Sequence, residues 1–420
     1  MLVFLCTLFL CCHCIFPIIH RSICTLNVTA VRCTAPLFPR LATPPSFAPF
    51  PTITVVQTRV RSTHTLLGPK HVAMYTTIAD DGGSVLVQRA AGGAVAVDVL
   101  LTIIEWANHC VVATASSHPV QPSIDTTTDP FSVSHPNATA FVAQVLSNDD
   151  AFAPSSAAAC RYSDDRGFFC AARGVGSKST VVQLTFSSDV ASVTHLNGLQ
   201  AADDGKYPLP DGPVPVGRTI ALLSHWQADV PDGWSMSDVF VTPHLRYADL
   251  SNVHLARTHD QVVGNVTVYG QLVTFSEAAC VVTHHDRVYL TGTSSQVKVQ
   301  LPRAVPRSSS IVMPSVQQSH LGSACSEDDP QLSAQCLVTL EFADCVTSSI
   351  WGEQACTSVL ARRPGADALT LPTGSSPPSA TTTITPFQIV VFGVCDPDFF
   401  RGLSSPAGAP PTTTALATTP

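Results

Sequence analysis

The sharpest local group of metal-ligating residue types is His284-His285-Asp286, which closely follows Cys280. Adjacent residues on a β-strand point to opposite faces, so two neighbouring imidazoles on regular β structure cannot bind the same ion. The pattern therefore predicts a solvated loop at this position, and we predict no metal ligand.

Paired aspartates are the second group that could carry chemistry. Several pairs stand beside Gly or Ser, where a turn can gather carboxylate and carbonyl oxygens around calcium. None follows the ligand spacing of a dedicated calcium loop, and turns rich in Asp have this composition for local hydrogen bonding alone. The sequence therefore predicts no cofactor, with calcium as the one alternative. Calcium binding would depend on these pairs: Asp80-Asp81, Asp149-Asp150, Asp164-Asp165, Asp203-Asp204 and Asp328-Asp329.

Signatures of nucleophilic catalysis are absent from the sequence. It contains no Gly-x-Ser-x-Gly elbow, no cysteine-protease signature and no Asp-Thr/Ser-Gly dyad. The glycine-rich stretch from Gly174 to Ser179 lacks the spacing of a phosphate-binding loop. We therefore predict a protein without catalytic residues, and a secreted hydrolase that lacks a recognisable motif stays open as an alternative.

The 15 cysteines fall into two groups. Six lie within the first 33 residues, where a hydrophobic leader from Met1 to Ile19 predicts a signal peptide. A retained membrane anchor is the alternative interpretation of this leader. Cleavage between Cys24 and Cys33 would leave ten cysteines, an even number that allows complete pairing.

The remaining cysteines and three glycosylation sequons indicate an oxidising, secretory compartment. The sequons begin at Asn27, Asn137 and Asn265. We predict an extracellular or cell-surface protein, with a disulfide between Cys160 and Cys170, which bracket a short loop. The disulfide candidates are Cys160, Cys170, Cys280, Cys325, Cys336, Cys345, Cys356 and Cys395.

Composition excludes one class of partner. Charged residues make up 12% of the chain, the formal net charge is −8, and Lys and Arg form no cluster. Proteins that bind the nucleic-acid backbone need clustered cations to displace counterions. We therefore expect no nucleic-acid partner.

Short β-branched segments predict strands. Ile53–Val60 and Val181–Phe186 are examples, and Val297, Val299 and Leu301 alternate with polar residues as a half-buried strand does. The segment 387–395 is apolar on both faces, as in a central strand. The segment 94–104 fits either a buried strand pair or a buried helix, and its β-branched residues favour strand. No segment repeats at a fixed period.

These patterns predict a mainly β protein built of two disulfide-stapled, antiparallel, sandwich-like units with long loops and a disordered C-terminal tail. The expected division is a signal peptide over 1–24, a Pro-rich linker over 25–51, one β-rich domain over 52–215, a second over 216–396, and a Pro/Thr-rich tail over 397–420.

The second unit shows an ordered series of motifs: Val268-Tyr269-Gly270, Cys280, Cys325, Cys336-Leu-Val338, Trp351-Gly-Glu-Gln-Ala-Cys356 and Phe387–Cys395. This series resembles the galactose- and rhamnose-binding lectin domain of the sea-urchin egg lectin type. The resemblance implies a sugar site in which Tyr269 covers a pyranose face and Glu277 accepts hydrogen bonds from hydroxyls, and a disulfide from Cys395 back to Cys280. The sequence departs from the family in the spacing of Cys325 and Cys336 and in having Gln271 after the Tyr-Gly.

Taken together, the residues predict a secreted or cell-surface glycoprotein with a non-enzymatic binding role, for which a glycan or a protein is the expected partner. A structural coat or matrix glycoprotein without a specific small ligand is the alternative. No membrane span is expected in the mature chain unless the leader is retained.

Overall fold

The computed structural model describes residues 17–36, 52–62, 74–79, 84–89, 96–106, 111–113, 118–120, 137–146, 158–163, 167–172, 178–200, 205–209, 211–228, 244–246, 252–256, 265–276, 280–285, 289–290, 296–314, 339–347, 354–362, 383–384 and 387–393. Within these ranges the chain forms antiparallel β-strands and one short 3₁₀ turn, with no α-helix. The prediction of a mainly β, antiparallel fold is confirmed.

One strand topology recurs along the described part of the chain, and its first copy (unit 1) has six strands. The last strand is the centre of an inner sheet, in the order β1-β6-β3, and the fifth is the centre of an outer sheet, in the order β2-β5-β4. The strands are β1 (Ile18–Leu26), β2 (Arg32–Pro36), β3 (Thr52–Ser62), β4 (Met74–Ile78), β5 (Ser84–Arg89) and β6 (Val97–Trp106).

The third copy (unit 3) has the same connections. Its inner sheet has the order β13-β18-β15 and its outer sheet the order β14-β17-β16. The elements are β13 (Ala191–Gln200), β14 (Gly205–Pro208), the 3₁₀ turn η2 (Val216–Arg218), β15 (Thr219–Ala228), β16 (His244–Arg246), β17 (Asn252–Ala256) and β18 (Asn265–Phe275).

The second copy (unit 2) keeps the central last strand. β9 pairs along β12 from Lys178 to Thr185, so β7 and β8 must share the opposite edge, as two pieces of one interrupted strand. β10 and β11 form a separate hairpin. The strands are β7 (Val111–Ala113), β8 (His118–Val120), β9 (Ala138–Leu146), β10 (Ala158–Ser163), β11 (Gly167–Ala172) and β12 (Lys178–Phe186).

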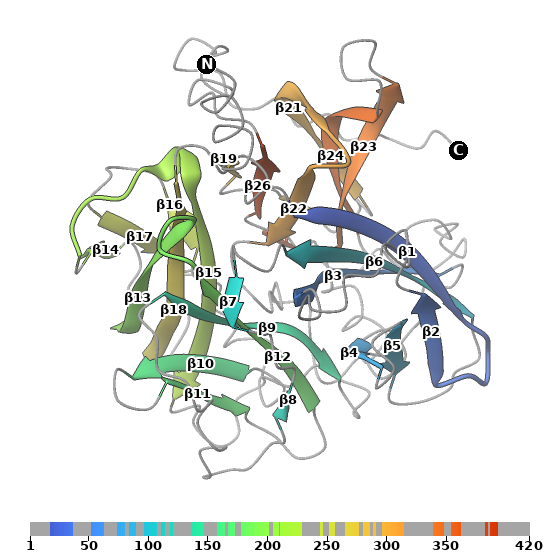
Figure 1. Ribbon diagram of the computed structural model, residues 1–420, viewed down its shortest axis with the longest axis horizontal. Coiled ribbons are helices and arrows are strands. Elements are labelled where there is room, and N and C mark those ends of the chain that lie inside the picture. The colour runs from blue at the N-terminus through green and yellow to red at the C-terminus, as the bar shows by residue number, and fades with distance from the viewer. Residues whose placement is uncertain are drawn as a thin grey trace, which may run out of the picture.

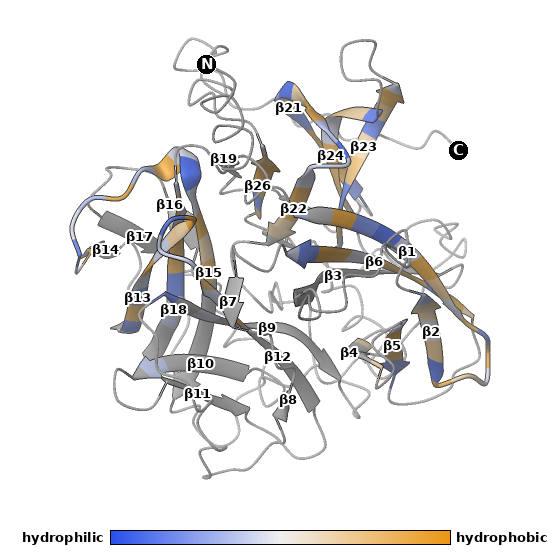
Figure 2. Ribbon diagram, in the orientation of Figure 1, coloured by the Kyte–Doolittle hydropathy of each residue, from blue (hydrophilic) through white to orange (hydrophobic). Residues whose placement is uncertain are grey.

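The fourth copy (unit 4) has an inner sheet in the order β19-β26-β22, an outer sheet in the order β21-β24-β23, and an added pair of β20 with β25. The strands are β19 (Cys280–His285), β20 (Tyr289–Leu290), β21 (Gln296–Pro306), β22 (Ser310–Pro314), β23 (Thr339–Thr347), β24 (Gln354–Arg362), β25 (Thr383–Ile384) and β26 (Phe387–Phe392). All residues of β26 are buried, and the strand is hydrophobic along most of its length (Figure 2).

The four inner sheets lie around the centre of the molecule (Figure 1). Each central strand ends in an aromatic residue: Trp106, Phe186, Phe275 and Phe392. These rings form a closed cycle of edge-to-face pairs, with centroid separations of 5.5, 5.8, 6.1 and 5.8 Å. Because aromatic rings prefer this geometry, the cycle joins one strand of every unit in a shared core.

The described residues form three hydrophobic cores. The shared core contains residues from all four inner sheets, including Ile104, Leu184, Val273 and Val390. A second core lies within unit 1, between its inner and outer sheets, and a third lies within unit 4. The alternation of side chains along a strand lets β6 serve two cores: Val99 and Leu101 face the core of unit 1, and Trp106 faces the shared core.

The N-terminal strands depart from the expected leader and linker. β1 crosses residue 24, where the signal peptide was expected to end, and β2 lies within the expected linker 25–51. β1 pairs with the whole of β6, and a disulfide joins Cys24 to Cys33. Cleavage between these two cysteines would remove most of β1, with its pairing to β6, and the disulfide partner of Cys33. The signal peptide over 1–24 stays a prediction.

The expected boundary near residue 215 falls inside unit 3. β13 precedes this residue and β15 follows it, yet both pair with β18 in one sheet. Hydrogen-bonded pairing on both sides of a central strand cannot be divided between two domains, so four similar units describe these residues better than two.

Candidate binding site

Of the two residues expected to contact sugar, the structure describes only Tyr269. Tyr269 lies in β18, half-buried, and pairs with Ser224 of β15. Glu277 lies outside the described residues. The site implied by the lectin resemblance therefore stays a prediction.

The cysteine expectations are met in part. Cys345 and Cys356 form a disulfide between β23 and β24. Cys160 and Cys170 stand directly opposite each other in the β10–β11 hairpin, the register that a disulfide would need. Cys280 opens β19, and the other three candidates lie outside the described residues: Cys325, Cys336 and Cys395.

The first sequon lies in a turn that a disulfide closes. Asn27 is exposed in the turn that joins β1 to β2, which the Cys24–Cys33 disulfide closes. The Arg89 guanidinium donates from Nε to the Ala30 carbonyl at 2.9 Å, and from Nη2 to the Asn27 and Val28 carbonyls at 2.8 and 3.0 Å. Arg89 is fully buried, and this burial lowers its pKa.

The other two sequons are placed differently. Asn137 is half-buried beside β9, and its carbonyl accepts a hydrogen bond from the Phe186 amide at 3.1 Å. Asn265 is the first residue of β18.

The metal expectations concern residues that are only partly described. His284 and His285 lie on the strand β19, so the prediction of a loop at these two residues is wrong. Asp286 and the five aspartate pairs lie outside the described ranges. Within those ranges, His, Cys, Asp and Glu nowhere gather in a group of three that could hold a metal ion. No helix in the same ranges combines the length and the apolar character needed to cross a membrane.

A pocket of about 270 Å³ lies at the seam between unit 1 and unit 4. At this seam the first and last units of the chain meet (Figure 1). Unit 1 contributes Arg21, Ser22 and Ile23 from β1 and Leu100, Leu101 and Thr102 from β6, and unit 4 contributes Arg307, Ile311, Val312, Leu340, Glu341 and Phe342.

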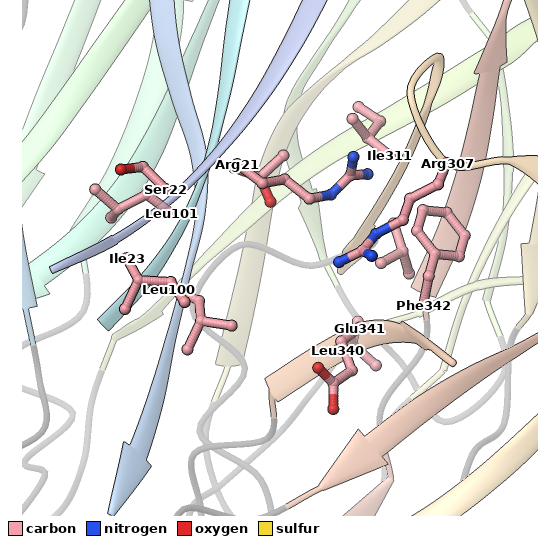
Figure 3. A pocket seen from close by; sticks show the side chains of 12 residues that line it. Arg21, Ser22, Ile23, Leu100, Leu101, Arg307, Ile311, Leu340, Glu341 and Phe342 are labelled. Carbon is pink, nitrogen blue, oxygen red and sulfur yellow. The ribbon is translucent and has the colours of Figure 1, made fainter. Parts of the chain in front are cut away.

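Two guanidinium groups converge on this pocket. Figure 3 shows the side chains of Arg21 and Arg307 extending toward each other, whereas the carboxylate of Glu341 points away from both. Arg21 Nη2 donates to the Ser310 carbonyl at 2.9 Å, and Arg307 Nη1 donates to Gln354 Oε1 at 2.6 Å. Within the described ranges, neither guanidinium is paired with a carboxylate.

The electrostatics of this pair favour an anion. Burial, reinforced by the charge of Arg307, lowers the pKa of Arg21 to about 10. Arg21 still carries its charge at neutral pH, because that value is well above 7. Two like charges held close together repel each other, and an anion placed between them relieves that repulsion. Guanidinium groups also match carboxylate oxygens geometrically through paired N–H donors.

The remaining lining offers both polar and apolar contacts. Ser22 and Thr102 carry hydroxyl groups, whereas Ile23, Leu100 and Phe342 present apolar surface. A small apolar pocket with a few convergent polar groups is the usual form of a ligand site. The arrangement therefore suits a small ligand with one anionic group, and it contains no nucleophile paired with a base.

Sequence reasoning missed this site because its residues are distant along the chain. Arg21 was assigned to the expected leader, and Arg307, which follows β21, lies 286 residues further along the chain. One signal was present near Arg21. Cys24 and Cys33 bracket a sequon turn at nearly the spacing that predicts a disulfide between Cys160 and Cys170, so the same argument would have placed β1 within the fold.

No protein-family model, curated protein or solved structure matches the chain.

Proposed function

We propose that this protein is a secreted or cell-surface glycoprotein with a non-enzymatic binding role, and that its ligand presents an anionic group to the pocket between units 1 and 4. The observation that carries the proposal is the convergence of Arg21 and Arg307 on one pocket. The secreted location is supported by the disulfides Cys24–Cys33 and Cys345–Cys356, since disulfides persist in oxidising compartments.

Isothermal titration calorimetry, which measures the Kd of small acidic and neutral probes, tests this proposal. The acidic probes are N-acetylneuraminic acid and N-acetyl-trialanine. The neutral probes are galactose, rhamnose and the C-terminal amide of N-acetyl-trialanine. We expect at least one acid to bind and the neutral probes not to bind, because only an anion offsets the paired guanidinium charges. If galactose or rhamnose binds while both acids do not, the pocket is not the ligand site and the lectin resemblance is the better guide.

Substitution of the two arginines should weaken binding of the acid. Arg307→Met and Arg21→Lys are each expected to raise the Kd about tenfold or more, since a charge-assisted hydrogen bond contributes about 1.5 to 3 kcal/mol. Arg21→Lys keeps the positive charge beside Ser310, which limits damage to the seam. Arg32→Met removes an exposed arginine of β2 and should leave the Kd unchanged. Equal affinities in all variants would contradict an arginine-based site.

A further inference from the structure

At the junction between units 3 and 4, a buried side chain of one unit forms hydrogen bonds with the backbone of the other. There the fully buried carboxamide of Gln388, on the central strand β26, reaches the edge of β15. The Ala221 amide donates to Gln388 Oε1 at 2.9 Å, and Gln388 Nε2 donates to the Ala221 carbonyl at 2.6 Å. The side chain thus satisfies both backbone groups of one edge residue, as a neighbouring strand would.

The seam between units 4 and 1 has a shorter residue at the corresponding position. Gln388 lies four residues before Phe392, and Thr102 lies four residues before Trp106, the aromatic residue that ends β6. Thr102 lines the pocket. The threonine side chain has two heavy atoms fewer than that of glutamine and cannot span the same distance, so space remains where the other junction is filled.

Val312 of β22, on the unit 4 side of the pocket, corresponds to Ala221 of β15 at the other junction. Ala221 pairs with Leu272, and Val312 pairs with Ile389; each partner lies three residues before the aromatic end of its central strand. Val312 therefore occupies in β22 the position that Ala221 occupies in β15. Like Thr102, Val312 lines the pocket.

The backbone groups of Val312 face this space. The Ser309 carbonyl accepts from the Phe392 amide at 2.9 Å and so faces β26, whereas the Ser310 carbonyl accepts from Arg21 at 2.9 Å and so faces unit 1. Successive residues of an antiparallel edge strand alternate in this way. Val312 has the same parity as Ser310, which directs its N–H and C=O toward the pocket.

We propose that the seam pocket binds the free C-terminal end of an extended peptide. The penultimate residue of the peptide pairs with Val312 through its N–H and C=O, in place of the missing glutamine carboxamide, and the terminal carboxylate lies between Arg21 and Arg307. A peptide antiparallel to β22 runs from Val312 toward Ser310, which brings its end to the guanidinium that Ser310 holds. Addition of a strand to a sheet edge and capture of a terminal carboxylate are both known modes of peptide recognition.

The size of the pocket limits how much of the peptide is enclosed. A volume of about 270 Å³ lies just below the range of ligand sites, which are about 300 to 1,000 Å³. Only the last residues of a chain fit, and the rest of the partner lies outside. The inference rests on the proposed binding of an anionic group and adds the class of ligand that carries it.

Three ligands and two variants test the inference. N-acetyl-trialanine is compared with its analogue N-methylated at the penultimate residue, which cannot donate to the Val312 carbonyl, and with N-acetylneuraminic acid, which carries a carboxylate without a peptide end. We expect the parent peptide to bind about tenfold or more tightly than either, since a lost backbone hydrogen bond leaves a buried acceptor unsatisfied at a cost of about 1 to 3 kcal/mol.

Thr102→Gln is the decisive variant, with Thr102→Ser as its matched control. The introduced glutamine should form on Val312 the two bonds that Gln388 forms on Ala221, so peptide affinity falls about tenfold or more while the melting temperature is kept or raised. Thr102→Ser should bind as the parent protein does. Unchanged affinity in Thr102→Gln, or full affinity of the N-methylated peptide, overturns the inference.

The same titrations separate this inference from the proposed function. Arginine-dependent binding of N-acetylneuraminic acid that equals or exceeds that of the peptide would overturn the peptide inference and keep the anion-binding function. Failure of both acids to bind would overturn both.

Discussion

Replacing Phe275 by alanine is expected to lower the free energy of unfolding by about 4 kcal/mol, because a buried Phe→Ala change removes apolar contacts and leaves a cavity. Phe275 is 2% exposed and stands in the aromatic cycle between Phe186 and Phe392. The substitution breaks two edge-to-face pairs, each contributing about 0.5 to 1.5 kcal/mol beyond burial. Denaturant unfolding followed by intrinsic fluorescence measures the loss.

The same variant tests whether the four units unfold together. The shared core draws residues from every inner sheet, so the loss should appear as a shift of one cooperative transition in calorimetry. Phe275→Leu keeps most of the apolar volume and should cost less than half as much, and Val346→Ala, at a residue 63% exposed, should have almost no effect. A transition that splits, with only one part shifted by Phe275→Ala, would contradict a core common to all units.

Replacing Arg89 by methionine is expected to cost about 3 kcal/mol of stability, the second largest effect. Methionine fills similar apolar space but donates no hydrogen bond, so the carbonyls of Asn27, Val28 and Ala30 lose their charged partner. Because the Cys24–Cys33 disulfide still closes the turn, the loss should grow when the two substitutions Cys24→Ala and Cys33→Ala are added.

Arg32→Met is the matched control for this effect. Arg32 lies on the neighbouring strand β2 and is exposed, so its loss should change stability by less than about 0.5 kcal/mol. Hydrogen exchange should locate the Arg89 effect, with faster exchange in the turn from residue 27 to 31. Equal stability of the Arg89→Met and parent proteins would show that water satisfies these carbonyls as well as the guanidinium does.

Much of the strand content could be predicted from local pattern. Alternation identified Val297 and Val299 on β21, and two-sided hydrophobicity identified β26 as a central strand. Within the ambiguous segment 94–104, residues 97–104 belong to the strand β6, which is buried on both faces near its end. These predictions succeeded because each rests on the period of side chains along one strand.

The fourfold recurrence could not be predicted, because the spacing between corresponding strands differs from unit to unit. The pairing of the last strand with the first and third is conserved in the topology, while loops of different length remove any fixed period. One short sequence similarity between units is visible once the strands are known. Gln183-Leu-Thr-Phe-Ser187 spans the end of β12, and Gln271-Leu-Val-Thr-Phe-Ser276 spans the end of β18.

The candidate site depends on contacts that local pattern does not encode. Arg21 and Arg307 meet only because the last unit packs against the first. The short side chain of Thr102 is informative only when it is compared with Gln388, which occupies the corresponding position in unit 4. The leader prediction also excluded Arg21 from the fold, since a hydrophobic N-terminal segment resembles a signal peptide whether or not its last residues enter a sheet. Tertiary closure, rather than residue type, creates this pocket.

The most direct measurement of the central claim is the response of individual arginine Nε–Hε signals in a ¹⁵N NMR titration with N-acetyl-trialanine, assigned through the Arg21→Lys and Arg307→Met variants. The account predicts saturable shifts of the Arg21 and Arg307 signals with one common Kd, and no shift of Arg89, whose donors are engaged at the Asn27 turn. Saturation of the protein by the peptide without movement of either pocket arginine would contradict it.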